Sequence, residues 1–193
     1  IRWVRTHAER LGIDPDRIAA GGGSAGGHVA ACTAVQTGWD EPGESTAVSS
    51  RPNLLVLYNP ALALAPFEGM RSRPETAARE LAARMGVDPV QLSPAHHVSG
   101  GVPPTIIFFG TDDNLLEGAQ YFERRMQEHG NACELVTYEG ERHGFFSFGR
   151  GGNTMFRRTL KATDRFLASH GWLTGPPTIE TSEPEAALRN ATE

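Results

Sequence analysis

The sequence predicts an α/β fold, in which a parallel sheet is flanked by helices. Four short apolar runs bounded by Gly, Pro or Asn have the composition of strands that are buried on both faces. Helical periods fill the intervals between these runs, and strands that alternate with helices form parallel sheets with crossover helices. The expected strands are Arg17–Gly22, Asn53–Asn59, Pro104–Gly110 and Cys133–Glu139.

The first strand follows a helical period that ends at Gly12. It is followed by Ala25–Gln36, a helix of small residues that can lie close to a sheet. The stretch from Pro60 to Pro94 then interrupts the alternation with scattered prolines and contains one helical segment, Pro74–Met85. We expect this stretch to run over an edge of the sheet and to shape a binding pocket.

Two amphipathic helices accompany the last two strands. Apolar residues recur at helical spacing in each of them, which predicts the faces that pack on the sheet. These residues are Leu115, Ala119, Phe122 and Met126 in one helix, and Phe156, Leu160, Thr163 and Leu167 in the other. The final stretch from Thr174 to Glu193 is rich in Pro, Thr and Glu, so we expect one domain over residues 1–173 and a disordered tail over residues 174–193.

Composition excludes several classes of function. The 193 residues carry a net charge of −5, which argues against nucleic acid or an anionic membrane as the main partner. The sequence contains no apolar run of about eighteen residues, the length that a membrane span needs. A small molecule or a neutral polymer is the expected substrate. Cys32 and Cys133 lie in apolar segments and are expected to be free thiols, and no compartment is predicted from them.

One serine stands on a glycine-rich turn between a strand and a helix. The segment Gly22-Gly23-Ser24-Ala25-Gly26 has the pattern G-x-S-x-G, and its serine lies at the carboxyl end of a strand beside a helix N-terminus. A tight turn of this kind explains Gly22 and Gly26, because a side chain at either position is expected to collide with the neighbouring backbone. A phosphate-binding turn is the alternative, but the Lys-Ser/Thr pair and the acidic residue of the known phosphate motifs are not evident.

A nucleophilic serine requires a histidine base and a carboxylate that orients the histidine. Both follow in order, because Asp112 and Asp113 come after the strand that ends at Gly110, and His143 comes after the strand that ends at Glu139. The spacing of Asn114 and Glu117 fits a capping box for the next helix, so capping does not require either aspartate. We assign Asp113 as the acid and keep Asp112 as the alternative.

The motifs "GGSAGGH", "GTDD" and "RHGFF" resemble the nucleophile elbow, the acid turn and the histidine loop of α/β-hydrolases. The resemblance is strongest to the esterase and lipase group, which includes hormone-sensitive-lipase-like and feruloyl- or acetylxylan-esterase-like members. It implies hydrolysis of carboxylic esters, including carbohydrate-linked esters, through an acyl-enzyme on Ser24. The family's Gly-Thr-x-Asp turn also favours Asp113. The alternatives are a serine peptidase of the prolyl-oligopeptidase type and a non-catalytic binding domain that retains the fold.

The sequence departs from this family pattern at its beginning. The family places several strands before the elbow, together with a His-Gly-Gly loop that contributes to the oxyanion hole, whereas residues 1–16 alone precede the first strand here. Ala25 can donate one backbone N–H, and the second donor has no evident source. Loss of one such donor commonly costs about a hundredfold to a thousandfold in rate. We therefore expect the C-terminal part of a hydrolase that is poorly active by itself.

The other histidines have simpler interpretations. His96 and His97 are adjacent and tend to point apart, so we expect structural or surface roles for both. His28 follows the elbow and is expected to pack or to face solvent. No Cys/His cluster has the spacing of a zinc site, and the sequence implies no metal and no cofactor.

Overall fold

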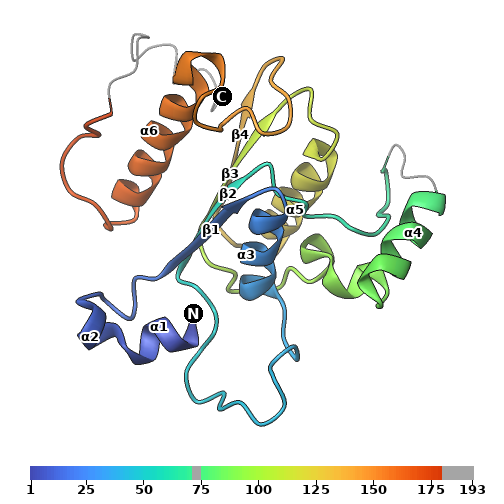
Figure 1. The fold of residues 1–193 in the computed structure, drawn as a ribbon, viewed down its shortest axis with the longest axis horizontal. Helices are drawn as coiled ribbons and strands as arrows, with labels where there is room; N and C mark the ends of the chain where they lie inside the picture. The colour runs from blue at the N-terminus through green and yellow to red at the C-terminus, as the bar shows by residue number, and fades with distance from the viewer. Residues whose placement is uncertain (71–74, 180–193) are drawn as a thin grey trace.

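Four parallel strands form one sheet in the computed structural model, which describes residues 1–70 and 75–179. The strands lie side by side in chain order (Figure 1). They are β1 (Ala19–Gly23), β2 (Leu54–Tyr58), β3 (Thr105–Gly110) and β4 (Cys133–Tyr138). Gly23 is paired with Tyr58, and Gly110 with Tyr138, so the carboxyl ends of the strands lie along one edge of the sheet. The predicted fold class and all four predicted strands are confirmed.

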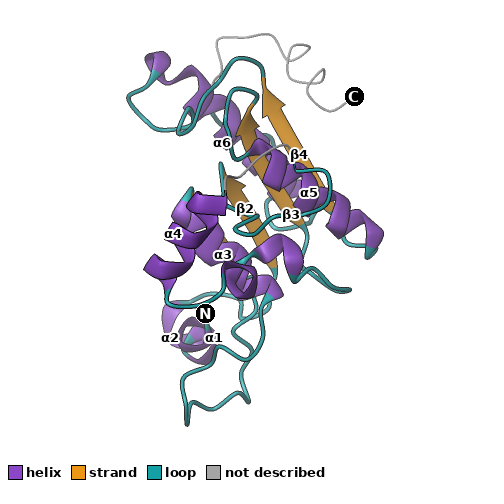
Figure 2. Cartoon of the chain, turned by 90° about the vertical axis from the view of Figure 1, so that its right-hand side faces the viewer, coloured by secondary structure: helices purple, strands orange, loops and turns teal. Residues whose placement is uncertain are grey.

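Helices cover both faces of the sheet, as Figures 1 and 2 show. On one face, α3 (Ala25–Val35) and α5 (Leu116–Glu128) pack against the side chains of Leu55, Leu57 and Ile107. On the other face, α6 (Thr154–Ser169) packs against the neighbouring positions of the same strands. Alternate residues of each inner strand therefore face different helices, which makes β2 and β3 apolar along their whole length.

Burial on both faces is confirmed for β2 and β3 but is wrong for β1 and for most of β4, where only Val136 and Tyr138 are buried. The central strands are buried almost throughout, whereas exposed and half-buried residues alternate along β1. Within the described ranges β1 and β4 are the two edge strands, so each has a strand neighbour on one side. In addition, β1 reads Ala-Ala-Gly-Gly-Gly and presents little side-chain surface of its own.

The predicted inner face is confirmed for α5 and is wrong in part for α6. Ala119, Phe122 and Met126 of α5 are fully buried. In α6 the buried residues are Thr159 and Phe166, whereas the predicted Phe156 and Leu160 are half-buried. The Thr159 hydroxyl donates a hydrogen bond to the carbonyl of Phe156, 3.1 Å away. Because this bond satisfies the hydroxyl within the helix, a threonine can occupy the core position.

Two short helices precede the sheet. They are α1 (Arg2–Thr6) and α2 (Ala8–Leu11), and α2 ends at Gly12 with a left-handed backbone (φ 66°), as expected of a helix C-cap. The predicted helical start is therefore confirmed, with an interruption at His7.

The described residues of the segment between β2 and β3 contain one α-helix and two 3₁₀ turns. These are α4 (Glu75–Met85), η1 (Pro89–Leu92) and η2 (Pro94–His96); the predicted first residue, Pro74, lies outside the described residues. Leu62, Ala63 and Ala95 belong to the same core as α3 and α5. The segment thus packs on the helical layer of one face, and the expected course over a sheet edge is wrong.

The remaining predictions on the ends and the cysteines have mixed outcomes. Cys32 and Cys133 are free thiols, as expected. Residues 174–179 form neither helix nor strand, and residues 180–193 of the predicted tail lie outside the described residues. None of the helices in the described ranges has both the length and the apolar character needed to cross a bilayer.

Candidate active site

Three loops at the carboxyl edge of the sheet bring a serine, a histidine and an aspartate together. Ser24 follows β1, Asp113 follows β3 and His143 follows β4. His143 Nε2 lies 2.9 Å from Ser24 Oγ, and His143 Nδ1 lies 2.7 Å from Asp113 Oδ2. The three predicted residues therefore form one continuous chain of hydrogen bonds.

Ser24 occupies a strained turn between β1 and α3. Its backbone has φ 53° and ψ −117°, an unusual conformation for a residue with a side chain, and such strain is concentrated at functional sites. Its N–H donates to the carbonyl of Tyr58 at 2.8 Å, and its own carbonyl accepts from His28 N at 3.0 Å. These two bonds fix the turn and leave the hydroxyl directed at His143.

The glycines of the turn have different roles from those predicted. A Cβ atom on Gly22 would lie 2.6 Å from the carbonyl carbon of Gly26, so the predicted collision is confirmed at Gly22. At Gly26 a Cβ atom would meet open space, and the predicted collision there is wrong. The closely packed helical glycine is Gly27, where a Cβ atom would lie 2.8 Å from the Gly22 oxygen and 2.9 Å from Pro60 Cβ. The phase of α3 turns Gly27 toward the sheet and Gly26 away from it.

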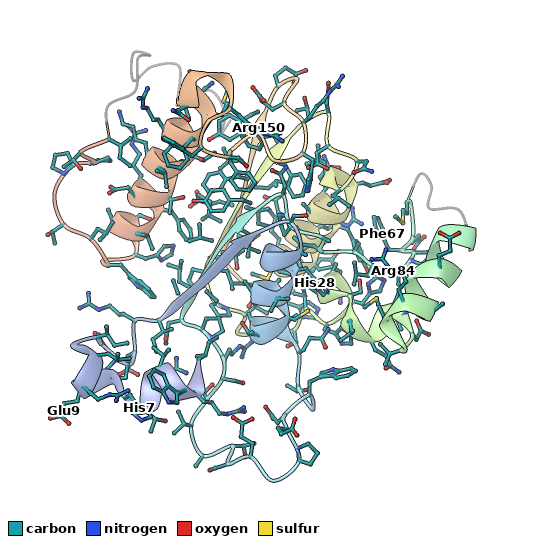
Figure 3. All side chains as sticks on the ribbon, viewed as in Figure 1. His7, Glu9, His28, Phe67, Arg84 and Arg150 are labelled. Carbon is teal, nitrogen blue, oxygen red and sulfur yellow. The ribbon has the colours of Figure 1, made fainter. Side chains whose placement is uncertain are left out.

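The histidine loop packs directly over the serine turn. A Cβ atom on Gly23 would lie 2.6 Å from Phe146 Cζ, so the absence of a side chain at Gly23 makes room for this ring. The Phe146 and Tyr58 rings lie 4.9 Å apart, which ties the loop to β2. Arg150 Nη1 also donates to the His143 carbonyl at 3.3 Å, and Figure 3 shows Arg150 in the loop between β4 and α6. Sequence reasoning missed the packing of Phe146 on the serine turn and the hydrogen bond from Arg150 to the His143 carbonyl.

Asp113 is the aspartate that contacts His143, and Asp112 is exposed to solvent. The Asp113 side chain has no exposed surface, whereas 43% of the His143 side chain is exposed. Asp113 Oδ1 accepts from Leu115 N at 2.9 Å. The predicted capping box is wrong, because α5 begins at Leu116 with Leu115 as its N-cap and the turn is closed by Asp113 itself.

Asn59 is a further polar residue that contacts this group. It lies one residue after β2, is fully buried, and donates from Nδ2 to Asp113 Oδ2 at 2.7 Å. Its sequence signal is weak, since an Asn before a Pro at the end of a strand is an ordinary turn residue.

Ala25 is the first residue of α3 and is exposed. The first N–H groups of a helix have no acceptor within the helix, and the helix dipole places partial positive charge at this end. The backbone N–H at Ala25 therefore lies beside Ser24 at the positive end of the helix dipole, and its role in an oxyanion hole stays a prediction.

The other histidines discussed above form hydrogen bonds with residues of the segment between β2 and β3. His28 Nε2 lies 2.7 Å from the carbonyl of Leu92 and 3.4 Å from Cys32 Sγ, and Figure 3 shows His28 on α3. His96 Nδ1 contacts Ser93 Oγ at 2.7 Å, and His97 Nε2 contacts a different group, the Val90 carbonyl, at 2.8 Å. The predicted packing roles are confirmed. Within residues 1–70 and 75–179, no three metal-binding side chains lie close enough to hold an ion.

A cavity of about 540 Å³ lies beside the acid turn. It is lined by Asp113 and Asn114, by residues of α5 and by Phe67–Gly69 of the segment after β2. The rings of Phe67 and Tyr121 stack 4.1 Å apart and join that segment to α5. The predicted contribution of this segment to a pocket is confirmed.

Comparison with known proteins decides the family. Residues 1–147 match the family described as alpha/beta hydrolase fold. The chain belongs to this family. This alpha/beta hydrolase is 31% identical over 166 residues to a probable isoprenylcysteine alpha-carbonyl methylesterase of Arabidopsis thaliana, covering 74% of this chain and 33% of that protein. It is 30% identical over 155 residues to esterase LipU of Mycobacterium tuberculosis, covering 75% of this chain and 50% of LipU.

Solved structures of an esterase have a higher sequence identity to this alpha/beta hydrolase than the two relatives above. The propionate-bound esterase Est2 of Thermogutta terrifontis has 46% sequence identity and a TM-score of 0.81, over 91% of this chain and 64% of that one. The same esterase phosphonylated by sarin gives a TM-score of 0.84 at 45% identity. The predicted resemblance to the esterase group is confirmed, and the chain spans a third to two thirds of the length of these relatives.

Proposed function

We propose that the protein hydrolyses carboxylic esters through an acyl-enzyme on Ser24, with His143 as the general base and Asp113 as the residue that orients it. The observation that carries this proposal is the continuous contact from Ser24 Oγ through the two His143 nitrogens to Asp113 Oδ2, at 2.9 and 2.7 Å. The esterase relatives support the choice of reaction.

The geometry gives each group a role. His143 Nε2 accepts the Ser24 proton while Ser24 Oγ attacks the ester carbonyl, and the same nitrogen returns the proton to the departing alcohol. Water then attacks the acyl-enzyme with His143 again as the base, which releases the acid and restores the serine. Asp113 Oδ2 accepts a hydrogen bond from His143 Nδ1–H throughout, so it fixes the tautomer and stabilises the imidazolium.

The Ala25 N–H is proposed as one donor to the oxyanion of the tetrahedral intermediate. It belongs to the helix that begins directly after Ser24, so it lies on the side where negative charge develops. The second donor is not assigned to any residue of the described ranges.

Short-chain esters are the proposed substrate class. The support is the 46% identical esterase of Thermogutta terrifontis, which has been solved with propionate and with butyrate bound. An acetylxylan esterase of Xylanibacter ruminicola is 26% identical over 186 residues, which makes carbohydrate-linked acetyl esters the next class to test. Comparing ester and peptide substrates with the same acyl group separates this proposal from a peptidase.

A fluorophosphonate probe tests the nucleophile. The probe reacts with activated serines, so we expect labelling of the folded protein that is lost in Ser24→Ala. Ser93→Ala is a matched control, because Ser93 also contacts a histidine, His96, at 2.7 Å but is fully buried. Circular dichroism confirms that each variant is folded. Equal labelling of the wild-type and Ser24→Ala proteins would refute the proposal. Absence of labelling that persists in a folded, N-terminally extended protein would favour a binding domain.

A further inference from the structure

We propose that Asn59 is a positioning residue, which fixes the Asp113 carboxylate in the orientation that faces His143. Its Nδ2 donates a hydrogen bond to Asp113 Oδ2 at 2.7 Å, the same oxygen that His143 Nδ1 contacts. The inference rests on the proposed function, because it assigns Asn59 to the residues that support the catalytic group.

Asn59 lies between the serine turn and the acid turn. Its N–H donates to the carbonyl of Phe108 on β3 at 2.9 Å, and the carbonyl of the preceding residue, Tyr58, accepts from Ser24 N at 2.8 Å. The backbone around Asn59 is therefore tied to the strand that leads to Ser24 and to the strand that leads to Asp113. A side chain at this position is held more firmly than one on a free loop.

Two local features of Asn59 are unfavourable for folding. Its backbone has φ 44°, in the left-handed region that few residues other than Gly and Asn adopt readily. Its Oδ1 is buried and has no hydrogen-bond partner among the described residues. Strained backbone conformations are concentrated at functional sites, and buried polar atoms are normally satisfied, so an unpaired one requires an explanation. The positive φ and the unpaired Oδ1 are both explained if Asn59 is present in order to donate from Nδ2 to Asp113.

The orientation of the amide follows from its partner. Turning the amide over would place Oδ1 in the position of Nδ2, 2.7 Å from a carboxylate oxygen, and two acceptors at that distance repel each other. The ionised Asp113 thus holds Oδ1 in its unpaired position. Asn59 Oδ1 is unpaired because the amide is turned so that its Nδ2 can donate to Asp113.

Asp113 receives three hydrogen bonds, of which two come from fixed donors. Leu115 N binds Oδ1 and Asn59 Nδ2 binds Oδ2, so the two together define the plane of the carboxylate. The third donor, His143, is half exposed and belongs to a loop. Without Asn59 the carboxylate keeps one fixed donor and can rotate about its Cβ–Cγ bond, which draws Oδ2 away from His143 Nδ1.

Two substitutions separate the donor from the backbone conformation. Asn59→Gly tolerates φ 44° and removes the donor. Asn59→Asp keeps the shape of the side chain and places a second carboxyl group 2.7 Å from Asp113, so that the two groups compete for one negative charge. Asn131→Asp is the matched control. Asn131 is also buried and uses both amide atoms, binding Val102 N and the Ser99 carbonyl, but it precedes β4 at the opposite end of the sheet.

We expect Asn59→Gly and Asn59→Asp each to slow fluorophosphonate labelling of Ser24 by about tenfold or more, the loss expected for one hydrogen bond to a charged group. With a short-chain ester, kcat falls and KM is unchanged, because ground-state binding of the substrate does not involve Asp113. Asn131→Asp lowers the melting temperature and leaves the labelling rate unchanged. In a crystal structure of Asn59→Gly we expect the Asp113 carboxylate to be rotated away from His143.

Wild-type labelling rates in Asn59→Gly, or an equal loss in Asn131→Asp, would overturn the inference. An unchanged Asp113 carboxylate in crystals of Asn59→Gly would overturn it as well. If the proposed function itself is wrong, Ser24 of the wild-type protein does not react with the probe, and this outcome differs from a change that is confined to the Asn59 variants. In that case the orientation of Asp113 in the Asn59→Gly crystals still decides the role of Asn59.

Discussion

Replacing Asp113 with Asn tests the charge that faces His143 and leaves the size of the side chain nearly unchanged. Two donors, Asn59 Nδ2 and His143 Nδ1, lie 2.7 Å from Oδ2, and Leu115 N lies 2.9 Å from Oδ1. An amide has one oxygen and one NH₂ group, so in either orientation its nitrogen faces at least one donor. This conflict leaves a buried group unpaired, which lowers the free energy of unfolding by about 1–3 kcal/mol.

The effect on reactivity comes from the lost charge. Opposite unit charges about 4 Å apart interact by about 4 kcal/mol at the effective dielectric constant of a partly exposed site. Without the carboxylate this stabilisation of the His143 imidazolium disappears, and each 1.36 kcal/mol corresponds to a factor of ten in rate. Asp113→Asn is therefore expected to slow the reaction of Ser24 by about a thousandfold.

The assay is the second-order rate of fluorophosphonate labelling, with urea denaturation to measure the loss of stability. Asp112→Asn is the matched control, since Asp112 is the exposed neighbour and makes its hydrogen bond through the backbone, from its N–H to the Glu141 carbonyl at 3.0 Å. We expect this variant to react within about twofold of the wild type. A loss of less than tenfold in Asp113→Asn, or a similar loss in Asp112→Asn, would refute the reasoning.

Four further substitutions test the packing and the pH dependence of stability. Gly22→Ala places a Cβ atom 2.6 Å from backbone at Gly26 and is expected to lower the free energy of unfolding, measured by urea denaturation, by about 1–3 kcal/mol. Gly26→Ala points into open space in a helix and is expected to raise the free energy of unfolding by up to about 1 kcal/mol. Phe122→Ala removes a fully buried ring, and urea denaturation should show a loss of about 3–5 kcal/mol. Burial raises the pKa of Cys32 from 9.0 to about 11. The folded state therefore retains this proton longer, so the free energy of unfolding falls between about pH 9 and pH 11, and Cys32→Ala should reduce that fall in urea titrations.

The sequence was sufficient to predict the sheet and the convergence of three loops. Short apolar runs separated by helical periods require parallel strands, and parallel strands place their carboxyl ends at one edge. Ser24, Asp113 and His143 each follow a predicted strand end, so their location at one edge of the sheet followed from topology. The family resemblance was a second reason to prefer Asp113 to Asp112, because two adjacent residues on a turn share the same topological position.

The rest could not be predicted because it depends on neighbours in space. The role of Gly27 in place of Gly26 is set by the rotation of α3 about its axis, and the inner face of α6 is set by a hydroxyl that bonds within the helix. The contact of Asn59 with Asp113 joins residues 54 positions apart, and no local pattern marks it. The half-exposed β1 likewise reflects its place at the end of the sheet.

Ser24 and His143 meet across 119 positions of sequence, and the strand that leads to His143 is the last of the four to be synthesised. A growing polypeptide that has passed the serine turn thus carries an inert hydroxyl until more than a hundred further residues have been added and β4 has docked on β3. Under the proposed mechanism, detachment of β4 alone would remove His143 from Ser24 while β1 and β2 remain paired, so the reactivity of Ser24 depends on the pairing of β3 with β4.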